Sequence, residues 1–278
     1  MHIPFQFENK GKLILGMAHI ADQQFQTPIV LIMCYGLNGN RVIQNRISVK
    51  LGEMLEKNGI NLIRFDYRNV GVSEGTFEQS NIEDRIDDIV EVCKYVKSCF
   101  YDKKIRIILI GFSDGARNAI QVTKSIYIDG LILWNPIFNV PAKCINSPGS
   151  KKEKLILHPL YKTPIKKLLG VGLGIDMIKQ IESENTLDSL EKYKNNILLL
   201  FGDSDELTKD IKFHLTSSGL TGKNNVDYFL IKNANHLFNR SAYIDEVFDI
   251  TIRWVFCNFD MESEKNEKYL HSDGQCQY

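Results

Sequence analysis

The chain has 278 residues, of which 44% are hydrophobic, a length and composition that suit one large core with an inserted subdomain. Its 34 basic residues balance 34 acidic ones, so charge gives no indication of binding to nucleic acid or to an anionic membrane surface. The six cysteines form no C-x-x-C pair and are interpreted as reduced thiols. Residues 1–12 lack the apolar run of a signal peptide, and no run is long enough to cross a bilayer, which predicts a cytoplasmic protein without a membrane partner.

Strands and helices are predicted to alternate along the first 134 residues. Runs of apolar and β-branched residues predict the strands, and apolar side chains at helical spacing predict the helices. In chain order, these elements are a hairpin at 5–8 and 13–19, a buried strand at 28–34, a helix at 42–55, a strand at 61–65, a helix at 82–96, a strand at 105–110 with a helix after it, and a strand at 130–134. Ser80 and Glu83 predict a capping box at the start of the second helix.

The segment Gly-Phe-Ser-Asp-Gly joins the strand at 105–110 to the next helix and places Ser113 at the centre of a G-x-S-x-G motif. This pattern is typical of the nucleophile elbow, a sharp turn that lifts a serine hydroxyl above the edge of a parallel sheet. The strained turn requires small neighbours, and Gly111 and Gly115 meet that requirement. The alternative is an ordinary glycine-containing turn, which the flanking strand and helix disfavour.

The second half of the chain begins with an irregular stretch. Residues 135–195 are basic, contain five prolines and predict either an inserted cap or a long surface excursion. Strands are predicted at 196–201 and 226–231, and a closing helix at 243–256. We therefore predict a core of residues 1–134 and 196–258, a cap at 135–195 and a polar, disordered tail at 259–278. The fold class is α/β, with a mostly parallel sheet covered by helices on both faces.

A serine nucleophile needs a general base and an acid that orients the base. His236 lies in the loop directly after the last predicted strand, where the base is expected; the alternative is a solvent-exposed loop histidine. The acid is expected after the preceding strand, where Asp203, Asp205 and Glu206 stand. Asp205 is also placed to cap the next helix, so this assignment stays open at this point.

The tetrahedral intermediate of acyl transfer needs two backbone N–H donors for its oxyanion. One is expected from Asp114, directly after the nucleophile, and the other from Leu37, in the loop after the first buried strand. Gly36 permits a close approach of this loop. The alternative is that Gly36 and Gly39 only form a turn.

Taken together, these motifs resemble the α/β-hydrolase superfamily, in particular its serine-aminopeptidase-like group, and they are nearest in pattern to bacterial cinnamoyl (feruloyl) esterases. The resemblance spans about residues 5–256 and is carried by Tyr35-Gly36, Asp66-Tyr67-Arg68, Gly71-Val72-Ser73, the G-x-S-x-G motif, the segment 202–205 and His236. Two positions depart from the family pattern. Asn69 replaces a glycine but tolerates a left-handed backbone, and Tyr35 replaces a histidine before the glycine of the oxyanion loop.

The resemblance implies an α/β-hydrolase fold and a catalytic triad of Ser113, Asp205 and His236, with Asp205 chosen because it stands three residues after Gly202. It also implies that the cap covers the site and sets substrate choice, and that neither a cofactor nor a metal is needed. Residues predicted to contact substrate are Tyr35, Gly36, Trp134 and Phe138.

The predicted function is therefore cleavage of a carboxylic ester through an acyl-enzyme intermediate, with a small-molecule acyl ester or thioester as partner. One alternative is a thioesterase or acyltransferase of a biosynthetic pathway that uses the same triad. Another is a non-catalytic binding protein on the same fold, because fold alone does not fix function. The sequence predicts no oligomeric state.

Overall fold

A computed structural model of the protein describes the chain except for residues 24, 102, 138–154, 159–163, 169–170 and 260–278. Its centre is an eight-stranded sheet in the order β1-β2-β4-β3-β5-β6-β10-β11. The first two strands form the predicted hairpin, β2 also runs antiparallel to β4, and all other neighbours are parallel. The strands are β1 (His2–Asn9), β2 (Lys12–His19), β3 (Ile29–Cys34), β4 (Asn61–Phe65), β5 (Arg106–Phe112), β6 (Gly130–Trp134), β10 (Asn196–Gly202) and β11 (Val226–Ile231).

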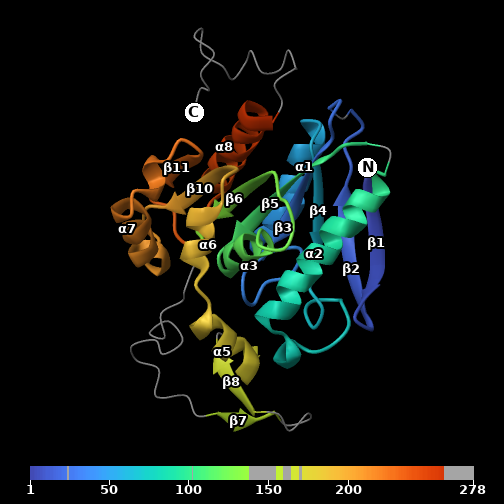
Figure 1. Cartoon of the computed structure of the whole chain (residues 1–278), viewed down its shortest axis with the longest axis vertical. Helices are drawn as coiled ribbons and strands as arrows, with labels where there is room; N and C mark the ends of the chain where they lie inside the picture. The colour runs from blue at the N-terminus through green and yellow to red at the C-terminus, as the bar shows by residue number, and fades with distance from the viewer. Residues whose placement is uncertain (24, 102, 138–154, 159–163, 169–170, 260–278) are drawn as a thin grey trace.

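Helices cover both faces of this sheet, in two groups (Figure 1). Helix α1 contacts α8 on one face, and α2 contacts α3, which contacts α6, on the other. The helices of the core are α1 (Ile47–Lys57), α2 (Ile82–Cys99), α3 (Asp114–Val122), α6 (Thr186–Lys192), α7 (Lys209–Ser217) and α8 (Ser241–Phe259). Short 3₁₀ turns lie at η1 (Gln44–Arg46), η2 (Phe77–Gln79), η3 (Glu206–Thr208) and η4 (Leu220–Gly222).

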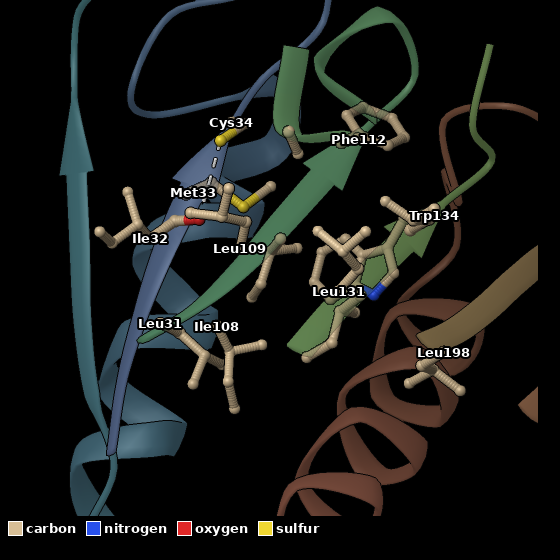
Figure 2. Close-up of a cluster of buried hydrophobic side chains, with 14 of the residues drawn as sticks. Leu31, Ile32, Met33, Cys34, Ile108, Leu109, Phe112, Leu131, Trp134 and Leu198 are labelled. Atoms are coloured by element: carbon tan, nitrogen blue, oxygen red, sulfur yellow. Dashed lines mark hydrogen bonds between the residues drawn. The ribbon is translucent and has the colours of Figure 1, made fainter. Parts of the chain in front are cut away.

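The central strands are apolar along their whole length because both of their faces are covered. Every residue of β3, β4 and β6 is buried, and Figure 2 shows side chains of β3, β5 and β6, such as Leu31, Ile108 and Leu131, packed against one another. Such continuous apolar runs are characteristic of parallel strands between two helical layers. The rigid sheet that results holds the loops at its carboxyl ends in fixed positions.

Within residues 135–195, the described residues between 155 and 183 form a second, smaller unit, whereas Asn135 and α6 pack with the core. Strands β7 (Ile156–Leu157), β8 (Pro164–Leu168) and β9 (Val171–Gly174) make an antiparallel sheet, and helix α5 (Ile175–Ser183) follows it. We call β7, β8, β9 and α5 the small sheet unit; in Figure 1 it lies at the end of the molecule opposite α8. An apolar cluster anchors it to the start of α2 and consists of Ile82, Leu173, Met177 and Ile181.

Two expectations about local chemistry are wrong. The N-cap of α2 is Asn81, whose side-chain oxygen accepts from the N–H of Asp84 at 2.8 Å, and Ser80 stands one residue too early to form the expected capping box. Cys34, Cys93 and Cys99 are free thiols, whereas Cys257 is disulfide-bonded, so the six cysteines are not all reduced. Among the described helices, none combines the length and apolarity needed to cross a membrane. The predicted tail, apart from Phe259 at the end of α8, lies outside the described residues.

Candidate active site

Ser113 occupies the turn between β5 and α3, and its backbone is left-handed, with φ of 56° and ψ of −126°. Non-glycine residues rarely adopt such a positive φ, and turns of this kind occur at functional sites. The turn is tight on both sides of the serine. A Cβ atom added at Gly111 would lie 2.4 Å from Cα of Ala116, and one added at Gly115 would lie 2.1 Å from the carbonyl oxygen of Cys34. The two glycines are therefore required by close packing.

His236 connects the serine to a carboxylate. Its Nε2 lies 2.8 Å from Oγ of Ser113, and its Nδ1 lies 2.7 Å from Oδ2 of Asp205. The imidazole stacks at 5.8 Å between centroids on the ring of Phe112, the residue before the serine, which fixes the plane of the ring. The structure thus brings together three residues that lie 31 and 123 positions apart in the chain, in the order hydroxyl, imidazole, carboxylate.

Of the two aspartates after β10, only Asp205 reaches the histidine. Its side chain is buried and also accepts hydrogen bonds from the N–H of Leu207 at 3.0 Å and from Oγ1 of Thr208 at 2.9 Å. Asp205 is therefore a helix cap and a histidine partner at once. Asp203 is exposed, and its carboxylate accepts a hydrogen bond from the hydroxyl of the neighbouring Ser204.

Asn135 joins the loops that carry the acid and the base, a role that no sequence motif indicated. It is fully buried at the end of β6, with φ of 38°. Its Oδ1 accepts from the N–H of Gly202 at 2.7 Å, and its Nδ2 donates to the carbonyl of His236 at 2.9 Å. A buried amide with both ends satisfied fixes the distance between its partners. These partners lie 67 and 101 positions away, so a local sequence pattern does not reveal them.

The two expected oxyanion donors belong to the residue after Ser113 and to the loop after β3. A Cβ atom at Gly36 would be 3.2 Å from Cβ of Ser113, so the loop after β3 passes directly beside the nucleophile. Within the part of the chain that the structure describes, neither the N–H of Leu37 nor that of Asp114 donates to a protein acceptor. The Asp114 N–H is one of the unpaired donors at the start of α3, where the helix dipole favours negative charge.

The loop after β4 contains the departure from the family pattern at Asn69. Asn69 has a left-handed backbone with φ of 67°, a conformation that asparagine was predicted to tolerate at this position. Its Oδ1 accepts a hydrogen bond from Nζ of Lys12. Asp66 organises the loop, because its carboxylate accepts from the N–H groups of Arg41 at 2.6 Å and Val72 at 3.0 Å. The loop therefore tolerates the replacement of glycine by asparagine.

Among the described residues that were predicted to contact substrate, Gly36 lies beside Ser113, but Tyr35 is fully buried. The hydroxyl of Tyr35 accepts from the N–H of Tyr67 at 2.8 Å, and burial raises its pKa well above the usual range. Trp134 is buried too, and its indole N–H donates to Thr251. The side chains of Tyr35 and Trp134 are thus part of the core, which gives no support to the prediction that they contact substrate. Phe138 lies outside the described residues.

One cluster away from this site has the spacing of metal ligands. His2, His19 and Glu56 place their ligand atoms within 4.8 Å of one another. However, Nε2 of His19 accepts from Nε of Arg64 at 2.8 Å, so the proton of the neutral ring is on Nδ1, the atom that faces Glu56. A metal needs an unprotonated nitrogen, and these residues do not fit one.

Comparison with known proteins places the chain in a family. A model of the family described as "Hydrolase_4: Serine aminopeptidase, S33" matches residues 44–196, which include the G-x-S-x-G motif but end before Asp205 and His236. No match was found among curated protein sequences.

Solved structures share the whole fold. Est1E from Butyrivibrio proteoclasticus, with ferulic acid bound, aligns with a TM-score of 0.76 and 17% identity, over 92% of this chain and 99% of that one. The esterase PF2001 of Pyrococcus furiosus aligns with a TM-score of 0.66 and 19% identity, over 92% and 90%. An alpha-beta serine hydrolase homologue from Coxiella burnetii aligns with a TM-score of 0.62 and 17% identity, over 91% and 97%. The α/β-hydrolase fold predicted from the sequence is confirmed.

Proposed function

The chain belongs to the serine aminopeptidase S33 family of α/β-hydrolases, and from this premise we propose that it hydrolyses carboxylic esters with a Ser113–His236–Asp205 triad. The observation that carries the proposal is the pair of contacts that His236 makes, 2.8 Å to the Ser113 hydroxyl and 2.7 Å to the Asp205 carboxylate. This chain of hydrogen bonds activates a serine as a nucleophile.

In the proposed reaction, Oγ of Ser113 attacks the ester carbonyl carbon while Nε2 of His236 accepts the hydroxyl proton. Asp205 holds the Nδ1–H tautomer and stabilises the imidazolium. The carbonyl oxygen becomes an oxyanion and accepts hydrogen bonds from the N–H groups of Leu37 and Asp114. His236 then returns the proton to the departing alcohol, and water releases the acid from the acyl-enzyme by the same steps in reverse.

Esters are the first substrate class to test, because one of the similar structures is of an esterase and another holds ferulic acid. At 17% and 19% identity this likeness supports the fold and guides the choice of probes. We expect the described small sheet unit and the rest of residues 135–195 to act as the cap that selects among esters.

Purified protein is assayed with p-nitrophenyl esters of short, medium and aromatic acids, and with matching acyl thioesters. We expect turnover of at least one ester and its loss in Ser113→Ala, with thermal unfolding unchanged. Turnover of thioesters alone would replace the ester proposal by the thioesterase alternative. Turnover of neither class by a folded wild-type protein would favour a binding protein on the hydrolase fold.

A further inference from the structure

Arg85 is a fully buried arginine on α2 that the proposed mechanism leaves without a role. Burying a guanidinium without partners is costly, so its contacts indicate what it does. Its Nε donates to Oγ of Ser80 at 3.1 Å, and its charged carbon lies 5.3 Å from the ring centre of Tyr67 and 5.9 Å from that of Phe77. These three contacts hold the guanidinium in place and leave its two terminal nitrogens to face other segments.

The first terminal nitrogen reaches the loop after β3. Nη2 of Arg85 donates to the carbonyl oxygen of Leu37 at 2.8 Å, across 48 positions of sequence. A charged donor makes this a stronger bond than one between neutral groups. The proposed mechanism assigns an oxyanion donor to the N–H of Leu37, so fixing the carbonyl of Leu37 restricts the backbone that carries this donor.

The second terminal nitrogen faces the other donor residue. Nη1 of Arg85 lies 3.9 Å from Oδ2 of Asp114, whose carboxylate is almost completely buried and is also 3.2 Å from Nε of Arg117. Arg117 is equally buried, but its Nη1 donates to the carbonyl of Ile181 and not to the loop after β3. Arg85 alone, among the described residues, links both of the expected donor residues.

We infer that Arg85 is a positioning residue that holds the two halves of the oxyanion hole in register, through the Leu37 carbonyl and the Asp114 carboxylate. The inference rests on the proposed function. Two backbone donors stabilise a developing oxyanion only when both are preorganised at hydrogen-bond distance from it, and a small displacement of one donor forfeits most of its effect. Losing Arg85 should therefore weaken binding of the transition state and leave binding of the ground-state ester almost unchanged.

The test uses the full chain, an ester that the wild-type protein turns over, and a trifluoromethyl ketone with the same acyl group. In the inhibited complex, Oγ of Ser113 bonds to the ketone carbon, the serine proton passes to His236, and the carbonyl electron pair becomes an oxyanion in the hole. The inhibition constant therefore reports on the hole without turnover. The variants are Arg85→Gln, Arg85→Lys and, as a matched buried control, Arg117→Gln.

For Arg85→Gln we expect kcat to fall about 10- to 100-fold, KM to change less than about threefold, and the inhibition constant to rise by the same factor as kcat/KM falls. Arg85→Lys should be intermediate, because an ammonium group lacks the fork that reaches both partners. Arg117→Gln removes a cation from the Asp114 carboxylate but leaves the bond from Arg85 to the Leu37 carbonyl in place, so each constant should change clearly less than in Arg85→Gln.

Unchanged constants in the Arg85 variants, a fall in kcat without a change in the inhibition constant, or an equal loss in Arg117→Gln would overturn the inference. If Arg85→Gln does not fold, Arg85→Lys decides by the same criteria. A wild-type protein that neither turns over esters nor binds the ketone would reject the proposed function itself. An active wild type with unaffected Arg85 variants would reject only the role of Arg85.

Discussion

The loops at the carboxyl ends of the main strands and the small sheet unit are held in different ways. The triad loops emerge from β5, β10 and β11, strands of a sheet with buried central members, and are cross-linked by Asn135 and by the partners of Asp205. The small sheet unit is anchored by an apolar cluster that includes Leu173 and Met177 and by the packing of β9 on η2. Hydrogen bonds add to this anchor: the N–H of Ile82 donates to Oε1 of Gln180 at 2.7 Å, and Nη1 of Arg117 donates to the carbonyl of Ile181. Polar contacts within the core thus set the geometry for chemistry, whereas the segment expected to select substrates packs onto η2, α2 and Arg117 of α3 and contributes none of the triad residues.

The largest expected effect on kcat comes from substitution of a triad residue in the core. Asp205→Asn should lower kcat by about two to four orders of magnitude, because an amide no longer fixes the tautomer of His236 or stabilises its cation. Asp203→Asn is the matched control two residues away. It should lower kcat less than about tenfold, because the carboxylate of Asp203 is exposed. Both values come from steady-state kinetics on one activated ester. The reverse order would show that Asp203 is the acid and Asp205 only caps the turn η3.

The core should also respond to acid through His19, which is fully buried on β2. Burial, followed by the charge of Arg64 and by His2 and the N-terminus, lowers the pKa of His19 to about 4. Between about pH 4 and about pH 6.5 the unfolded chain therefore binds more protons at this position than the folded chain does, and the free energy of unfolding falls as the pH falls through that window.

Urea unfolding at about pH 7 and about pH 5 tests this expectation in the wild type and in His19→Gln. Between about pH 7 and about pH 5, the free energy of unfolding of the wild type should fall by about 1–2 kcal/mol more than that of the variant. Burial raises the pKa of Asp88 to about 6, which acts in the opposite direction but cancels in the comparison because both proteins contain it. Equal losses in the two proteins would show that His19 does not contribute to the acid response.

The smallest effect on chemistry is expected from the small sheet unit. Leu173→Ala should loosen its anchor on α2, and we expect the ratio of kcat/KM values for a small and a bulky ester to change about 3- to 10-fold. The rate of covalent labelling at Ser113 should stay within about twofold. Leu199→Ala, in the buried strand β10, is the control; it should lower the unfolding temperature and leave the substrate ranking unchanged. If Leu173→Ala lowers the kcat/KM values of all esters by the same factor, the small sheet unit does not select among them.

The sequence predicts a feature of the site well when the residues that form it are adjacent in the chain. The elbow around Ser113 is a five-residue pattern bounded by a strand and a helix, and it was visible without the structure. The roles of Asn135 and Arg85 depend on hydrogen bonds to partners many positions away. The residues next to a single asparagine or arginine in the sequence do not reveal such a bond. The burial of Trp134 was not predicted for a different reason, because an aromatic residue at the end of a buried strand has the same sequence pattern whether it faces a pocket or the core.

Labelling with a fluorophosphonate probe tests the central claim, that His236 and Asp205 activate Ser113, most directly. The phosphorus of the probe bonds to an activated serine oxygen and fluoride leaves, so peptide mass spectrometry identifies the nucleophile. We predict a single adduct, on Ser113, that is absent in Ser113→Ala and forms much more slowly in Asp205→Asn. An adduct on another serine, or none on the folded wild-type protein, would show that Ser113 is not an activated nucleophile.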